Sequence, residues 1–327
     1  MPDQVTTCQC PDCTGPQYFA GDVWDTGGLS DDWGADADGL RAYACPYCGA
    51  ELLCGGSAAA AGCPYCGSPT VTPGRLSGKR KPDFVLPFRL SREDAAKALK
   101  EHCRGKPFLP RRFTAENHLL QALRGVYVPC WLCDGAAMGD ASFDAVRTHM
   151  AREGHDEVTR TEHYDVYRAG SVTFEKVPVN ASAKLPDDDM DAIGPYDCAE
   201  LKPFSAACLN GFPAEQYGVT AGDCARRADA RCAAVLTDAL RAAVTGYDGC
   251  TVMAQNCTLR RGRVRYALLP VWMLNTKWNG RGYLVAINGQ TGRLVGELPM
   301  SWGKFWGLFA AVAVPLAAIG TAMSIWL

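Results

Sequence analysis

The sequence predicts an α+β protein with three parts: a small cysteine-rich ribbon, a larger α+β domain of two weakly repeated halves with antiparallel sheets, and one C-terminal transmembrane helix. Three observations predict this arrangement: two nearly identical Cys-Pro-Tyr-Cys-Gly motifs, a Pro-x-Trp motif that occurs twice, and an uncharged apolar run at the end. We expect an acidic N-terminal segment with a partial cysteine knuckle at 1–40, the ribbon at 41–78, the α+β domain at 79–300 and a C-terminal anchor at 301–327.

The ribbon prediction depends on two copies of one loop. Each copy places two thiolates on a tight turn, and the glycine that follows can adopt a positive φ. Two such turns that face each other supply four sulfur ligands, the set that Zn²⁺ prefers in closed, structural sites. We therefore predict one structural Zn²⁺, held by Cys45, Cys48, Cys63 and Cys66. A pair of redox dithiols is the alternative, but that chemistry needs only one such motif, on a thioredoxin-like βαβ unit.

The first forty residues contain a third cysteine cluster, formed by Cys8, Cys10 and Cys13. The cluster is half of a ribbon without a second Cys-x-x-Cys nearby. It is a remnant, or it takes Cys54 as a further ligand, or it shares a metal with a second chain, which leaves a homo-oligomer open. The acidic linker that follows has Trp24 and Trp33 as its only large anchors.

Composition limits the class of protein. A chain of 327 residues with 48% hydrophobic residues can bury a sizeable core in more than one domain. The net charge is −2, but residues 1–78 carry nine acids against two bases, the wrong sign for binding phosphate groups. The 17 cysteines, many of them isolated, indicate a reducing cytosolic compartment, and no signal peptide is expected at the N-terminus.

The α+β domain should begin after the basic residues 79–81. The predicted elements are a strand at 84–88, a capped helix from Ser91 to His102, a strand at 125–132, an antiparallel meander at 140–178, a helix at 220–245, a strand at 266–273 and a strand-turn-strand at 283–295. Segments 128–132 and 269–273 align with each other, which predicts two related halves. Cys130 and Cys133 fit this buried strand better than a metal knuckle. The histidines at 149, 155 and 163 are irregularly spaced and favour solvation or hydrogen bonding over metal ligation.

The chain ends with 23 uncharged residues at 305–327, enough for a helix to cross a hydrocarbon core of about 30 Å. Trp302 and Trp306 lie at one end of the run and Trp326 at the other, as interfacial aromatics do. A buried C-terminal helix is the alternative. We predict a single-pass protein of the cell membrane, with the bulk of the chain in the cytoplasm.

Many motifs together resemble a bacterial family of zinc-ribbon membrane proteins, often labelled TFIIB-type zinc ribbon-containing proteins or primosomal (PriA-like) helicases. The motifs are CPYCG…CPYCG, KPDFVLPFRLSREDA, KPFLP, RGVYVPCWL, HYDVYRAGSVTFEKVPV, LKPFS, RYALLPVWMLNTK, INGQTGRLVGELP and SWGKFW. The resemblance implies an association with flotillin-like (SPFH) proteins and the phage-shock system, and thus a recruitment role in envelope stress. Members of the family often carry two complete ribbons, so the half-ribbon at Cys10 departs from its pattern.

The helicase label finds no support, because residues 74–80 lack the spacing and the hydroxyl of a phosphate-binding loop. No other catalytic motif occurs, and we expect no enzyme. The leading prediction is a membrane-anchored zinc-ribbon adaptor that recruits other proteins at the cytoplasmic face. A membrane-tethered nucleic-acid binder, which the acidic N-terminal third argues against, and a thiol or zinc redox sensor are the alternatives.

Overall fold

The computed structural model describes residues 23–56, 62–69, 71–74, 79–110, 120–153 and 156–326. Its strands are β1 (Leu40–Ala44), β2 (Glu51–Gly55), β3 (Thr72–Pro73), β4 (Phe84–Val85), β5 (Leu123–Glu153), β6 (Asp156–Asn180), β7 (Lys202–Pro203), β8 (Ala214–Glu215), β9 (Gly249–Trp278), β10 (Arg281–Asn288) and β11 (Leu294–Gly296). Its helices are α1 (Arg92–Cys103), α3 (Asp187–Ile193), α4 (Ala225–Ala242) and α5 (Trp302–Trp326), with 3₁₀ turns η2 (Gly34–Gly39), η4 (Cys198–Glu200) and η5 (Ala206–Leu209).

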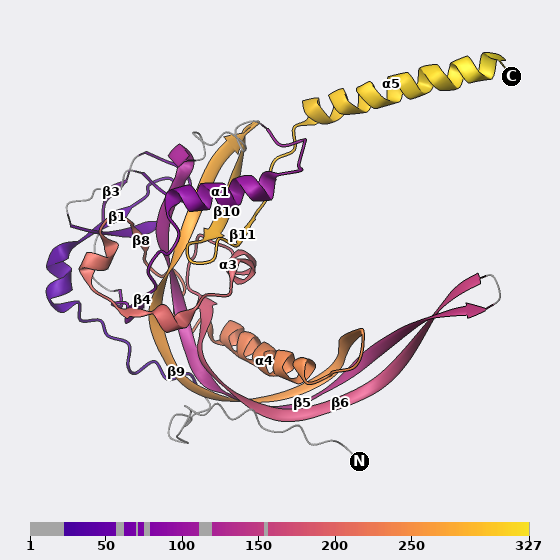
Figure 1. Cartoon of the computed structure of the whole chain (residues 1–327). Helices are drawn as coiled ribbons and strands as arrows, with labels where there is room; N and C mark the ends of the chain where they lie inside the picture. The colour runs from indigo at the N-terminus through magenta and orange to yellow at the C-terminus, as the bar shows by residue number, and fades with distance from the viewer. Residues whose placement is uncertain are drawn as a thin grey trace.

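One mixed sheet joins the ribbon to the larger domain. Among the described residues its main order is β11-β10-β9-β5-β8-β2-β1-β3, with β6 paired to β5 and β4 paired to β7 and β9. β5, β6 and β9 contain 31, 25 and 30 residues, and Figure 1 shows them curving around α4. The meander predicted at 140–178 is therefore a single long hairpin of β5 and β6.

The long strands curve because their two faces differ. Small or aromatic side chains alternate on the inner face of β5 and are buried against α4: Ala137, Ala141, Phe143 and Ala145. Bulges interrupt the pairing of β5 with β9 between Cys133 and Gly135 and between Ser142 and Phe143. Since a bulge bends a strand and increases its twist, these two interruptions let the sheet wrap around the helix.

The two halves predicted from the sequence face each other at the centre of the sheet. Val128 on β5 pairs with Leu269 on β9 in antiparallel register. An antiparallel pair of strands can have a local two-fold axis, which here passes between the directly paired residues Val128 and Leu269. The aligned segments 128–132 and 269–273 are thus the two copies around that axis.

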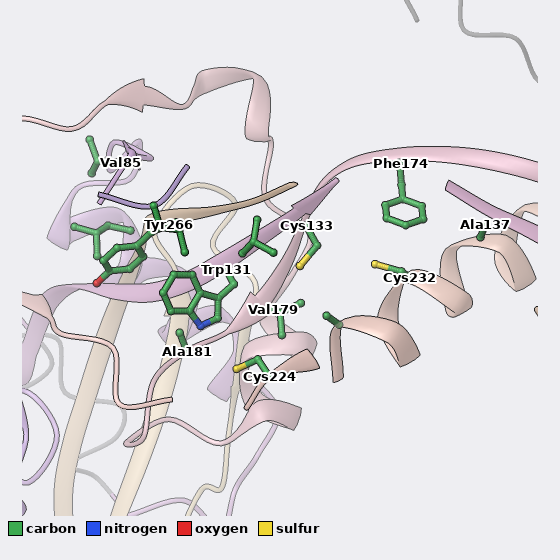
Figure 2. Close-up of a cluster of buried hydrophobic side chains, with 14 of the residues drawn as sticks. Val85, Trp131, Cys133, Ala137, Phe174, Val179, Ala181, Cys224, Cys232 and Tyr266 are labelled. Carbon is green, nitrogen blue, oxygen red and sulfur yellow. The ribbon is translucent and has the colours of Figure 1, made fainter. Parts of the chain in front are cut away.

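In each half, a buried tryptophan on the central strand donates a hydrogen bond to the turn before the helix of the same half. Trp131 Nε1 donates a hydrogen bond to Val219 O at 3.1 Å, and Trp272 Nε1 donates one to Leu90 O at 3.1 Å. Both indole rings are nearly fully buried, so their N–H groups need these partners. Figure 2 shows Trp131 with its core neighbours, including Tyr266 and Val179.

Other hydrogen bonds repeat in the same way. The strand ends repeat in the bonds Ala181 N to Pro129 O (3.0 Å) and Gly289 N to Pro270 O (2.9 Å). The turns before α1 and α4 repeat in the backbone bonds Asp94 N to Ser91 Oγ (3.1 Å) and Asp223 N to Thr220 Oγ1 (3.2 Å). β8 pairs with β5 and α4 packs on β5 and β6, whereas β4 pairs with β9 and α1 packs on β9 and β10. The first unit is contiguous in sequence, and the second is split between the two ends of the domain.

Several smaller predictions are confirmed. Cys130 and Cys133 are each 1% exposed within β5 and pair with β9, as a core strand requires. His163 is exposed and hydrogen-bonds to Asp144 at 3.0 Å, and His149 is exposed, whereas His155 lies outside the described residues. Trp33, in the acidic linker, is buried, and Trp24 Nε1 donates to Asp229 at 3.0 Å.

The predicted fold class is wrong in its last element. The C-terminal apolar run forms α5, but in the part of the chain that the structure describes, no helix has the length and apolarity that crossing a membrane requires. The first turn of α5 is bound to the domain instead. Lys304 Nζ donates to Leu109 O at 2.6 Å, and the rings of Phe305 and Phe108 pack with centroids 5.5 Å apart.

The finding that no described helix could cross a membrane overturns the prediction that the apolar run at 305–327 does so. The anchor predicted at 301–327, the tail-anchored single pass and the location in the cell membrane therefore lose their basis.

The repeated indole bonds predict matched stability losses. Trp131→Phe and Trp272→Phe should each lower the free energy of unfolding by about 1–3 kcal/mol, because each leaves a partly buried carbonyl without its donor and a smaller ring in the core. Chemical denaturation measures both losses. Trp302→Phe, at a position 58% exposed, is the control and should change stability by less than about 0.5 kcal/mol. Unchanged stability in either core variant would show that its indole hydrogen bond does not stabilise the fold.

Candidate metal centre

Two loops of the same geometry carry the four predicted cysteines. The first loop joins β1 to β2, and Gly49 at its end has φ 68°, while Gly67 at the end of the second has φ 72°. In the first loop Gly49 N donates to Cys45 O at 2.8 Å, and in the second Gly67 N donates to Cys63 O at 3.0 Å. The left-handed glycine closes each turn, which is why glycine follows both Cys-x-x-Cys motifs.

The structure brings all four predicted sulfur atoms together. They lie within 4.8 Å of one another and form a group that could hold a metal ion. The Sγ atoms of Cys45 and Cys66 are 3.5 Å apart, and so are those of Cys48 and Cys63. The first cysteine of each loop, Cys45 or Cys63, is at most 3% exposed. The second cysteine of each loop, Cys48 or Cys66, is partly exposed. Each loop thus contributes one buried and one partly exposed ligand.

Cys54, which was weighed as a further ligand, does not join this group. Cys54 is buried on β2, and in the described chain the metal group contains four cysteines without it. The cluster of Cys8, Cys10 and Cys13 lies outside the described residues.

The loops prepare one sulfur for ionisation. Burial raises the pKa of the Cys45 thiol, but backbone N–H groups of Cys48 and Tyr47 donate to its sulfur and bring the pKa down to about 7. Burial raises the pKa values of Cys48 and Cys63. Since the thiolate is the metal ligand, metal binding must release protons from these thiols and should weaken in acid.

The second loop is anchored in the core by a residue that the sequence did not indicate. Tyr65, 7% exposed, donates its hydroxyl hydrogen bond to Glu215, which is 2% exposed on β8. Ser182 Oγ donates to the same carboxylate oxygen at 2.6 Å. Tyr47, the matching tyrosine of the first loop, is 79% exposed. The two loops are alike in backbone geometry and different in how they contact the protein.

Two further side chains fix the loops from outside the ribbon. Lys184 Nζ donates to Cys48 O, and Asn275 Nδ2 donates to Tyr65 O. Neither contact could be found from the sequence, because both partners lie more than 100 residues away from the loops. The only local signal was the repeated tyrosine between the cysteines.

Several remaining cysteines lie in the core rather than on the surface. Figure 2 shows Cys133, Cys224 and Cys232 among apolar side chains. Burial raises the pKa of Cys54 and of Cys224 to about 11, and that of Cys130 and of Cys232 to about 12. Buried thiols with raised pKa values are poor nucleophiles. These four residues therefore offer no reactive site.

Comparison with known proteins found a bacterial relative. The chain is 32% identical over 239 residues to the uncharacterized protein YdjG of Bacillus subtilis (strain 168), a match that covers 73% of this chain and 70% of the relative. No model of a known protein family matches the chain. No solved structure matches it either.

The four-cysteine group predicts that only substitutions of its own cysteines remove the metal. Cys45→Ser and Cys63→Ser should each remove the bound metal, because three sulfurs do not close the shell. Elemental analysis of the purified chain measures the metal content. Cys54→Ser is the matched control: it changes an equally buried cysteine in the same ribbon and should retain the metal. Equal metal content in all three variants would contradict the site.

Glu215 predicts a dependence of stability on pH. Burial raises its pKa from 4.5 to about 7, against the hydrogen bonds from Ser182 and Tyr65. Between these values the folded state binds more protons than the unfolded state, so stability falls as pH rises. The contribution of Glu215 to the free energy of unfolding is complete below about pH 4.5 and is lost by about pH 7. Its size is at most about 3 kcal/mol.

Glu215→Gln should remove this dependence while keeping a hydrogen-bond acceptor for Tyr65. Denaturation of both proteins at several pH values measures the difference. The variant should become more stable relative to the natural chain as pH rises from 5 to 8. A constant difference over this range would show that Glu215 does not titrate there.

Proposed function

The chain belongs to the family of the Bacillus subtilis protein YdjG, and we propose that it is a zinc-stabilised adaptor without enzymatic activity, which binds another protein along its long sheet. The observation that carries the proposal is the edge of β6. Among the described residues β6 hydrogen-bonds to β5 alone, so its other edge offers unpaired backbone groups. An exposed edge is a template on which a partner's extended segment can add a strand.

Zinc is the metal that suits the four-cysteine group. Sulfur atoms 2.3 Å from Zn²⁺ in a tetrahedron are about 3.8 Å apart, close to the 3.5 Å pairs in the loops. Four protein ligands leave no position for water or substrate, so the ion has a structural role. It holds together the two loops that carry the four cysteines.

The length of the edge supports a binding role. With 25 residues at roughly 3.3 Å each, β6 extends over about 80 Å of chain, far more than the strands of most sheets. The hairpin of β5 and β6 continues beyond Val146, where the pairing of β5 with β9 ends (Figure 1). Its outer part is therefore a two-stranded arm.

Exposed apolar side chains on the long strands also support a protein-binding role. Met138 on β5, Tyr167 on β6 and Met253 on β9 are 45%, 55% and 68% exposed. Methionine is flexible and polarisable, and it occurs often on surfaces that bind proteins. Flotillin-like and phage-shock proteins are the first partners to test, on the basis of the resemblance to the zinc-ribbon family.

The two alternatives have weaker support. A nucleic-acid binder would need a positive surface, but the N-terminal third is acidic. A redox sensor would need accessible thiols with low pKa values, but burial raises those of Cys54, Cys130, Cys224 and Cys232.

Photocrosslinking tests the adaptor function. A photoreactive phenylalanine analogue at Tyr167 should give a discrete crosslinked protein in cells that make the chain, because this residue lies on the exposed part of β6. The same analogue at Tyr47, which is more exposed but lies on the ribbon, is the control and should give none. Mass spectrometry identifies the partner.

With that partner purified, Tyr167→Asp should weaken binding at least tenfold, and Tyr47→Asp should not. A partner that crosslinks equally from both positions, or no adduct from Tyr167, would contradict the proposed surface.

A further inference from the structure

A cavity of ≈270 Å³ is lined mainly by the first repeat unit, and none of the four cysteines of the metal centre lines it. β5, β6, α4, β9 and the segment from α3 to η4 all contribute to its wall. The volume is near the lower end of the range for small-molecule pockets, which is about 300–1,000 Å³. Met190, Leu269 and Pro178 give the wall an apolar part, and the exposed residues Glu175 and Asp191 lie where it meets solvent.

Arg231 is the cationic group of this wall. Its Nη1 forms an ion pair with Asp191 on α3. Its Nε is buried and has no hydrogen-bond partner. A buried N–H group without a partner is unfavourable, and arginine keeps its charge in proteins. The guanidinium therefore binds Asp191 through Nη1 and keeps the Nε–H donor for a ligand.

Lys176 lines the same cavity from a bulge. Two residues of β6, Glu175 and Lys176, lie opposite Asp134 alone on β5. Lys176 has φ 56°, an uncommon conformation for a residue with a side chain, and its N–H donates to Asp134 Oδ1 at 2.7 Å. Bulges often redirect side chains toward binding sites. This bulge brings a second cation to the cavity wall.

The second repeat unit lacks both cations. The capped turns at Ser91 and Thr220 place His102, which is exposed, at the position of Arg231. β10 pairs with β9 without a bulge where β6 has Lys176. The pair of cations is thus a property of the first unit and not of the repeated fold.

We propose that this cavity binds a small organic monocarboxylate, with its carboxylate on Arg231 and Lys176 and its apolar body against Met190 and Leu269. A planar carboxylate can accept two parallel N–H bonds from one side of a guanidinium. The nearby carboxylates of Asp191 and Glu175 disfavour a doubly charged phosphate. The inference is independent of the adaptor function.

Calorimetry on the full chain tests the site with hexanoate and benzoate as probes, hexanol and benzyl alcohol as neutral analogues, and inorganic phosphate. At least one carboxylate should bind saturably with one site per chain, at least tenfold tighter than its alcohol. Arg231→Met should weaken that binding at least tenfold. Arg227→Met is the matched control, because Arg227 lies one turn earlier on α4 and pairs with Asp187 in the same way, but does not line the cavity.

Arg231→Lys and Cys198→Phe keep the result interpretable if Arg231→Met does not fold. The first retains the charge but lacks the fork of donors and should weaken binding several-fold; the second fills the cavity and should abolish it. No saturable carboxylate binding, equal binding of the alcohols, preferential binding of phosphate, or undiminished binding by the Arg231 variants would each overturn the proposal.

Discussion

The antiparallel pairing of β5 with β9 is the interaction on which the rest of the structure depends. It sets two similar strand segments around a local two-fold axis at Val128 and Leu269. Because of this axis, each half satisfies the buried indole N–H of Trp131 or Trp272 with a carbonyl from a distant turn. The same pairing forms the floor on which α4 packs. Val128 and Leu269 at the axis are both fully buried, so the pairing also lies in the core of the domain.

The metal loops are attached to this frame through one short strand. β8 pairs with β5 on one side and with β2 of the ribbon on the other. Its Glu215 accepts hydrogen bonds from Tyr65 and Ser182, so a buried carboxylate joins the cysteine loop to the main sheet. Buried polar groups are costly unless each has a partner, which makes this network specific for one placement of the loop. The ribbon is consequently part of the larger sheet rather than a separate appendage.

The features that the sequence predicted are those encoded within a few residues. The Cys-x-x-Cys-Gly loops, the cap at Ser91 and the repeated Pro-x-Trp segment all depend on local spacing, and the structure contains each of them. The role of Glu215 and the cavity at Arg231 depend on contacts between distant segments, which no local pattern contains. The transmembrane prediction failed for a related reason. A count of uncharged residues predicted a span, whereas no helix in the described chain is long and apolar enough to cross a membrane, and the contact of α5 with Phe108 is between distant segments.

The split second unit has a consequence for synthesis on the ribosome. The first unit is complete once α4 has emerged, so its hairpin and helix can associate early. α1 emerges before it, but the strands that cover its apolar face end only at Asn288. At 5–20 residues per second, this face waits roughly 10–40 s for its partner. During that interval the early helix is an exposed apolar surface in a nascent chain, the kind of segment that chaperones protect.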